Sequence, residues 1–79
     1  MIVAYMLIRA KHGKLKIVSS KLKEYPEIEE IHEVYGRFDI IAKIFVEDEI
    51  SLKQFIQNKI FIVEGIHDTE TLLVYDNLS

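Results

Sequence analysis

The chain has 79 residues, which allow one domain, 1–79, and leave no room for a second. Its composition, 49% hydrophobic and 29% charged, is typical of a folded soluble domain rather than a disordered chain. A net charge of -3 argues against a free-standing nucleic-acid binder, and the lack of cysteine excludes disulfides and thiolate metal sites. So short a chain has a marginal core, and we expect a partner subunit to complete it.

The apolar N-terminus, Met1–Ile8, is too short for a membrane span and carries no basic leader or cleavage site. We therefore expect a cytoplasmic protein with no membrane partner. The sequence has no phosphate loop, dinucleotide fingerprint or nucleophile elbow. His12, His32 and His67 are scattered, without the spacing of metal ligands. We expect no catalytic residues, no metal site, no cofactor and no enzymatic activity.

Hydrophobic periodicity divides the first half of the chain into a strand, a helix and a second strand. Ile2–Ile8 is an unbroken apolar run of the kind found in a strand buried on both faces. An amphipathic helix then extends from Lys14 until Pro26 ends it. Ile28–Tyr35 can alternate as a strand, although its glutamates are poor strand formers. The apolar positions of the helix are Leu15, Val18, Leu22 and Tyr25.

The second half repeats the pattern after a glycine. Gly36 predicts a tight hairpin turn, followed by a strand at Asp39–Val46. The acids of Glu47–Glu49 are typical of a helix N-terminus. Gly65 is expected to cap the helix just beyond its end, and Ile66–Tyr75 forms the last strand. The inward positions of this helix are Leu52, Phe55, Ile56, Ile60 and Val63.

The resulting order, βαββαβ, predicts an α+β ferredoxin-like fold: a four-stranded antiparallel sheet with both helices on one face. If the other face met water, its strands would alternate apolar and polar residues. The three strands at Ile2–Ile8, Asp39–Val46 and Thr71–Tyr75 do not alternate cleanly. We therefore expect a second copy of the same sheet to cover that face.

Two polar segments are candidates for function. In the turn, Asp39 would present a partly exposed carboxylate, which either pairs with an ammonium group or satisfies turn amides. Thr69 and Thr71 are two residues apart, so both hydroxyls point to one face of the last strand. They either bind a polar ligand or serve only as good strand formers. Together, the segments suggest a small polar pocket used for sensing.

These segments also carry a family resemblance. Pro26–Glu30 (PEIEE), Val34–Lys43 (VYGRFDIIAK), Gly65–Ile66 and Thr69–Val74 (TETLLV) resemble the ligand-binding domain of Lrp/AsnC transcriptional regulators, the RAM domain. The resemblance covers essentially the whole chain with matching element order. It implies dimers of the α/β barrel type, joined through their sheets and assembling further, commonly into octamers. It also implies that an amino acid or related small effector binds between dimers.

Carried over by motif position, the resemblance assigns roles to individual residues. Asp39 would bind the amino group of the effector. Turn amides around Gly36 and Arg37, or Arg37 itself, would bind its carboxylate, while Tyr35 supplies an apolar wall. The full set of expected effector-binding residues is Tyr35, Gly36, Arg37, Asp39, Thr69 and Thr71.

The resemblance also sets the expected partners and the alternatives. Full-length regulators carry an N-terminal helix-turn-helix domain, whereas this chain begins at the first strand of the sensor. We therefore expect a stand-alone sensor without direct nucleic-acid binding, which can co-assemble with full-length regulators. The alternative is a small cofactor-free oxygenase or isomerase of the dimeric α/β barrel class, an analogy of fold alone.

Overall fold

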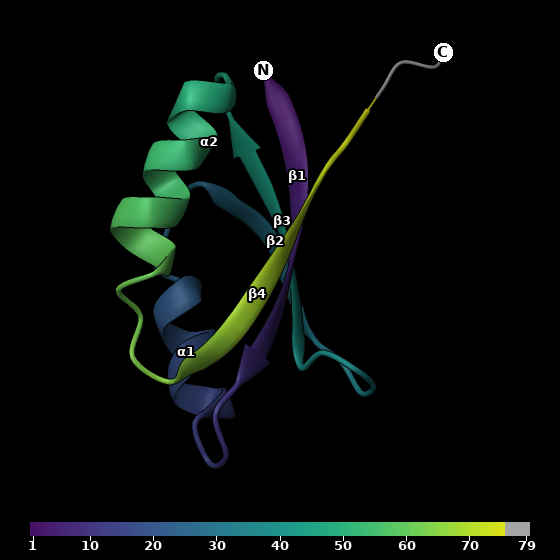
Figure 1. The fold of residues 1–79 in the computed structure, drawn as a ribbon, viewed down its shortest axis with the longest axis vertical. Helices are drawn as coiled ribbons and strands as arrows, with labels where there is room; N and C mark the ends of the chain where they lie inside the picture. Colours follow the sequence, from purple (N-terminus) through teal and green to yellow (C-terminus); the bar gives the residue numbers. More distant parts are fainter. Residues whose placement is uncertain (76–79) are drawn as a thin grey trace.

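The computed structural model describes residues 1–75 and confirms the ferredoxin-like α+β fold. The strands form one antiparallel sheet in the order β2-β3-β1-β4. Figure 1 shows both helical segments on the same side of this sheet, which leaves its other face open. The elements are β1 (Ile2–Ala10), α1 (Leu15–Leu22), β2 (Ile28–Glu33), β3 (Ile40–Val46), α2 (Glu49–Phe55), η1 (Ile56–Ile60) and β4 (Ile66–Leu73).

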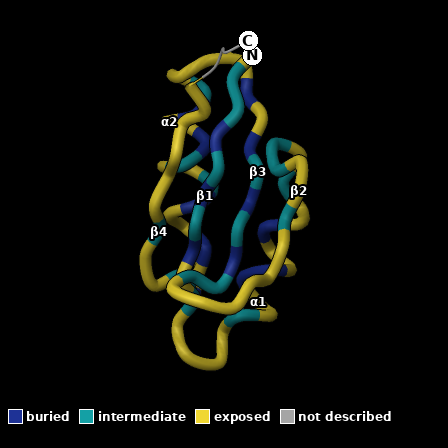
Figure 2. Tube along the Cα trace, turned by 90° about the vertical axis from the view of Figure 1, so that its right-hand side faces the viewer, coloured by how far each residue is buried: buried dark blue, intermediate teal, exposed yellow. Residues whose placement is uncertain are grey.

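The two central strands, β1 and β3, place alternate residues against the helices. Along β1, Ala4, Met6 and Ile8 are completely buried, and the residues between them are half-buried (Figure 2). The register pairs Met6 with Ala42 and Ile8 with Ile40, so the buried side chains of both strands share the helix-covered face. In the single chain the first strand is thus fully buried on one face, not on both as its sequence predicts. The helical segments complete the core with Val18, Leu22, Leu52, Phe55 and Ile60.

Helix α1 ends at Leu22, four residues before the proline expected to stop it. The chain continues in a turn in which the amide of Tyr25 donates to the carbonyl of Leu22 at 3.1 Å. Tyr25 packs edge-to-face on Phe55, with ring centroids 5.7 Å apart, and its hydroxyl donates to the carbonyl of Lys59 at 2.8 Å. Tyr25 therefore joins the core from a turn rather than from the helix.

The second helix changes from α to π geometry at Ile56. The amide of Phe61 donates to the carbonyl of Ile56, five residues earlier, at 2.9 Å. Phe55 and Ile60 are also five residues apart and both are buried. In a continuous α-helix, residues on one face recur at steps of three or four. Two residues five positions apart would therefore align less well on a single inward stripe. The wider turn therefore brings Ile60 into the core.

Helix α2 begins with a side-chain cap. Asp48 lies at the N-cap position, where its Oδ1 accepts a hydrogen bond from the amide of Ser51 at 2.8 Å. This bond holds the pKa of the Asp48 carboxyl below its usual value. The expected cluster of acids at this helix start is thus confirmed, and Asp48 is the residue that satisfies the helix amide.

Asp48→Ala is expected to lower the unfolding temperature slightly at neutral pH, because it removes this hydrogen bond, whereas Asp48→Asn keeps an acceptor. The folded-state pKa is depressed, so the carboxylate's contribution is present above the unfolded pKa. It disappears as the pH falls through the folded value. Thermal unfolding followed by circular dichroism should therefore show wild type and Asp48→Ala converging as the pH falls through the folded-state pKa of Asp48. A constant difference across that range would contradict the assignment.

Candidate functional site

The connection between β2 and β3 forms a loop at one end of the sheet. It spans residues 34–39 and is closed by a hydrogen bond from the amide of Val34 to the carbonyl of Asp39 at 2.8 Å. It is longer than the tight turn expected, and Asp39 lies in the loop rather than in β3. Gly36 has a φ of +152°, as expected for a glycine at this turn.

Asp39 fastens this loop to β1. Its amide donates to the carbonyl of Ile8 at 2.9 Å, and its Oδ2 accepts from the amide of Ala10 at 2.9 Å. The pairing of β1 with β3 ends at Ile8 and Ile40, so no strand continues beside Ala10 on that side. The half-buried Asp39 carboxylate supplies an acceptor at this position. The alternative in which Asp39 serves a backbone amide is therefore part of the structure, although the amide belongs to β1 rather than to the turn.

The start of β4 lies on the other side of the same end of β1. Thr69 pairs with Ile8, and Thr71 pairs with Met6. Both threonines therefore project to one face, as expected, and this is the face that carries the helices. Thr69 is half-buried, whereas Thr71 is exposed and lies further along the strand.

A pocket of about 320 Å³ lies where the loop and the start of β4 meet. It brings Arg37 and Thr69 together, one from each predicted segment. Tyr35 is fully exposed, and Tyr35, Gly36, Asp39 and Thr71 are not among the lining residues. The lining residues are Arg9, Arg37, Phe38, Asp68, Thr69 and Glu70.

Sequence reasoning missed the most prominent polar feature of this pocket, an ion pair between β1 and β4. Arg9 donates through Nε to Oδ1 of Asp68 at 2.9 Å and through Nη2 to Oδ2 at 2.5 Å. The paired guanidinium lowers the pKa of the Asp68 carboxyl, and Asp68 raises the pKa of Arg9. The two residues are 59 positions apart, so the only signal in the sequence is the strand order that places β1 beside β4.

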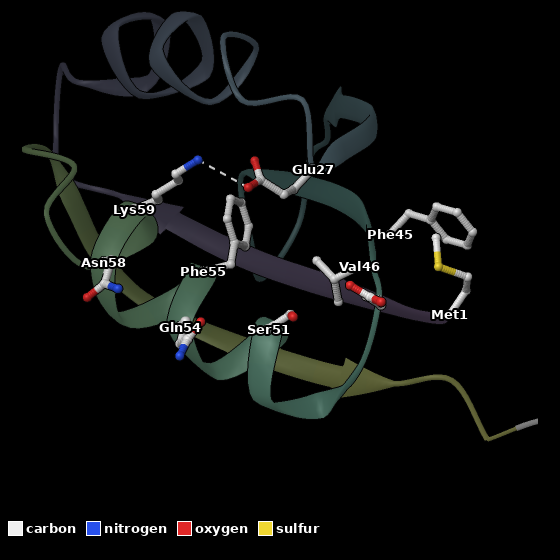
Figure 3. A pocket seen from close by; sticks show the side chains of 10 residues that line it. Met1, Glu27, Phe45, Val46, Ser51, Gln54, Phe55, Asn58 and Lys59 are labelled. Atoms are coloured by element: carbon white, nitrogen blue, oxygen red, sulfur yellow. Dashed lines mark hydrogen bonds and ion pairs between the residues drawn. The ribbon is translucent and has the colours of Figure 1, made fainter.

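A larger pocket, about 480 Å³, lies at the opposite end of the sheet, and none of the predicted site residues lines it. Figure 3 shows Lys59 reaching across to Glu27, where Nζ lies 3.1 Å from Oε2. Met1 and Phe45 lie together at the other side of this pocket. A third pocket, of about 360 Å³, has His67 in its wall.

Within residues 1–75, no group of three or more histidine, aspartate or glutamate side chains is arranged to hold a metal ion. No helix in the same range is long and apolar enough to cross a membrane.

The chain belongs to the Lrp/AsnC family, because the model of the Lrp/AsnC ligand binding domain matches residues 3–79. It is 38% identical over 73 residues to the HTH-type transcriptional regulator FL11 of Pyrococcus furiosus. That match covers 92% of this chain and 48% of FL11. The chain thus spans about half the length of this curated relative.

Solved structures support the same assignment. TTHA0845 from Thermus thermophilus superposes with a TM-score of 0.93 at 29% identity, covering 100% of this chain and 99% of that one. FFRP-DM1 gives a TM-score of 0.91 at 35% identity, covering 95% and 100%. The regulator NMB0573 from Neisseria meningitidis, solved as a complex with L-Met, shares the fold with a TM-score of 0.87 at 14% identity, covering 99% and 52%.

Proposed function

We propose that this domain senses an amino acid or a related small metabolite and passes the signal to transcription through its state of assembly. The observation that carries the proposal is the pocket at the end of β1, where Arg37 and Thr69 meet. The L-Met complex of NMB0573 supports this ligand class. Of the other expected residues, Asp39 holds the loop in place, Tyr35 and Gly36 precede Arg37 in the loop, and Thr71 follows Thr69 by two residues in β4.

The open face of the sheet supports a homodimer. Its central residues are apolar and half-buried or exposed, with Phe45 41% and Leu72 47% accessible in the single chain. The register places them on the face opposite the helices. A second copy would bury this face and supply the core that a short chain lacks. The apolar residues of the open face are Val3, Tyr5, Leu7, Ile41, Phe45 and Leu72.

The pocket lies at the charged end of the open face, and Arg9 and Asp68 occupy its rim. In such a dimer the partner would form a further wall near this rim. Ligand bound there would favour the association state that completes its site, which couples effector to assembly. Ligand that binds between dimers would favour further association, up to an octamer, in the same way.

The transcriptional output would arise in the cytoplasm through contact with full-length regulators of the same family. Relatives named as HTH-type transcriptional regulators support this output. We propose a non-enzymatic role, because those names and the surface position of His67 give no support to an oxygenase or isomerase.

Isothermal titration calorimetry with the twenty L-amino acids tests this function. Wild-type protein is expected to give saturable binding to at least one of them. The variant Arg37→Ala should weaken that binding by about tenfold or more, because it removes a charged group from the pocket wall. Lys53→Ala, on the exposed side of α2, serves as the control and should bind like wild type. Absence of saturable binding in the wild type would overturn the proposal.

A further inference from the structure

The charges around the pocket are balanced. Its wall contains two cationic side chains, Arg9 and Arg37, and two anionic ones, Asp68 and Glu70. Their formal charges cancel, so neither a simple anion nor a simple cation is favoured by net charge. A ligand with separated charges of both signs matches this arrangement better than either. The volume of about 320 Å³ is at the small end of the range for ligand pockets, about 300–1,000 Å³.

Arg9 and Asp68 have bonding capacity beyond their mutual ion pair. The pair uses Nε and Nη2 of Arg9, and a guanidinium carries further N–H donors on its other edge. Each carboxylate oxygen of Asp68 has a second lone pair. The two side chains are 45% and 46% exposed, so solvent-sized groups reach both. A ligand can therefore bind both residues while their own pair stays intact.

We propose that Arg9 binds the carboxylate, and Asp68 the ammonium group, of a zwitterionic α-amino acid in this pocket. The inference rests on the proposed sensing function and specifies its recognition chemistry. Both groups of an α-amino acid lie on one carbon, as the paired charges of Arg9 and Asp68 lie side by side. The ligand side chain then points toward Phe38, the uncharged side chain of the wall, because the Thr69 side chain projects to the helix-covered face.

Asp39, the other carboxylate at this end of the sheet, is better suited to positioning the loop. Its Oδ2 is occupied by the amide of Ala10, and its own amide is bonded to Ile8. Asp68 lines the pocket and Asp39 does not. The charge of Asp68 is therefore required for binding, whereas at Asp39 only an acceptor for Ala10 is required.

The experiment compares three ligands on five proteins by calorimetry. The ligands are each L-amino acid that binds wild type, its decarboxylated amine and its deaminated acid. The proteins are wild type, Asp68→Asn, Arg9→Gln, Asp39→Asn and the control Lys16→Gln. Lys16 forms an exposed ion pair with Glu33 at 2.8 Å, and neither residue lines the pocket. Lys16→Gln therefore removes a surface ion pair without changing a pocket residue.

Each variant has a distinct expected profile. Asp68→Asn should weaken the binding of the amino acid and of the amine by about tenfold or more, and leave the binding of the acid unchanged. Arg9→Gln should weaken the binding of the amino acid and of the acid, and leave the binding of the amine unchanged. Asp39→Asn should bind like wild type, because its side-chain oxygen still accepts from Ala10. Lys16→Gln should also bind like wild type.

Two results would overturn the inference while leaving the sensing function intact. One is an amino acid that binds Asp68→Asn and Arg9→Gln as tightly as wild type. The other is an equal loss for all three ligands, which indicates a structural role for the pair. Should a variant fail to fold, NMR of wild-type protein decides instead, because the Arg9 Nε–H resonance must shift on titration. If wild type binds no amino acid, the proposed function itself fails.

Discussion

Ile41→Asp is expected to convert the proposed dimer into monomers. Ile41 lies on the open face, paired with Leu7 in β1 and with His32 in β2. In a sheet-to-sheet dimer its side chain would be enclosed, and Lys43, the cation of the same strand, already pairs with Glu29 at 3.6 Å. An uncompensated buried charge costs about 3–5 kcal/mol, enough to weaken association by at least about a hundredfold. Light scattering coupled to size-exclusion chromatography would measure the change in mass.

Ile50→Asp is the matched control for this substitution. Ile50 lies on α2 and is 68% exposed in the single chain, on the side of the molecule away from the open face. The same chemical change there should leave the dimer intact. An unchanged mass for Ile41→Asp, or monomers from Ile50→Asp, would place the interface elsewhere. If Ile41→Asp fails to fold, the wild-type unfolding temperature decides, since it must rise with protein concentration for a dimer.

Gly65→Ala is expected to destabilise the fold by about 2–5 kcal/mol, the sum of backbone strain and overpacking. Gly65 has a φ of +102°, a backbone conformation that residues with a side chain rarely adopt. A Cβ atom there would lie 2.9 Å from Cγ2 of Val18 and 3.0 Å from Cβ of Lys14. The carbonyl of Gly65 also accepts from the amide of Lys11 at 2.7 Å, so the backbone has little room to move. Each kcal/mol should lower the unfolding temperature by about 4–8 °C.

Gly13→Ala separates the two contributions. Gly13 also has a positive φ, +77°, but no atom lies within 4 Å of the position of its Cβ. The loss of stability in Gly13→Ala should therefore reflect backbone strain alone, about 1–2 kcal/mol. Urea unfolding of both variants would measure the difference. Equal losses would show that the contact with helix α1 contributes nothing at Gly65.

The element order was predictable because the hydrophobic period changes between strands and helices. The β2 strand was confirmed over Ile28–Glu33 despite its glutamates, because Ile28 and Ile31 pack against the core while Glu30 does not. The π-turn, which brings Ile60 to the core beside Phe55, was not predicted. Helix ends were less predictable, since Pro26 limits a helix without requiring it to continue that far.

The pocket was predictable only in part. The chain order allowed Arg37 and Thr69 to be grouped, because a turn and a strand start at one end of a sheet are neighbours. Arg9 and Asp68 carry no local pattern, and only the register of β1 with β4 pairs them. The hydrogen bond from the amide of Ala10 to the Asp39 carboxylate depends on where β3 begins. Hydrophobic periodicity does not determine where a strand begins or ends.

The strand order also has a consequence for how the chain folds. The central strand β1 is made first, yet its neighbours are β3 and β4, and the pair Ala4–Leu73 joins residues from nearly opposite ends of the described chain. Contacts between residues so distant in sequence form slowly, because a long loop must close before they are made. On the ribosome, the second edge of β1 would remain unpaired until β4 has emerged, which makes this stage of synthesis the most exposed to aggregation.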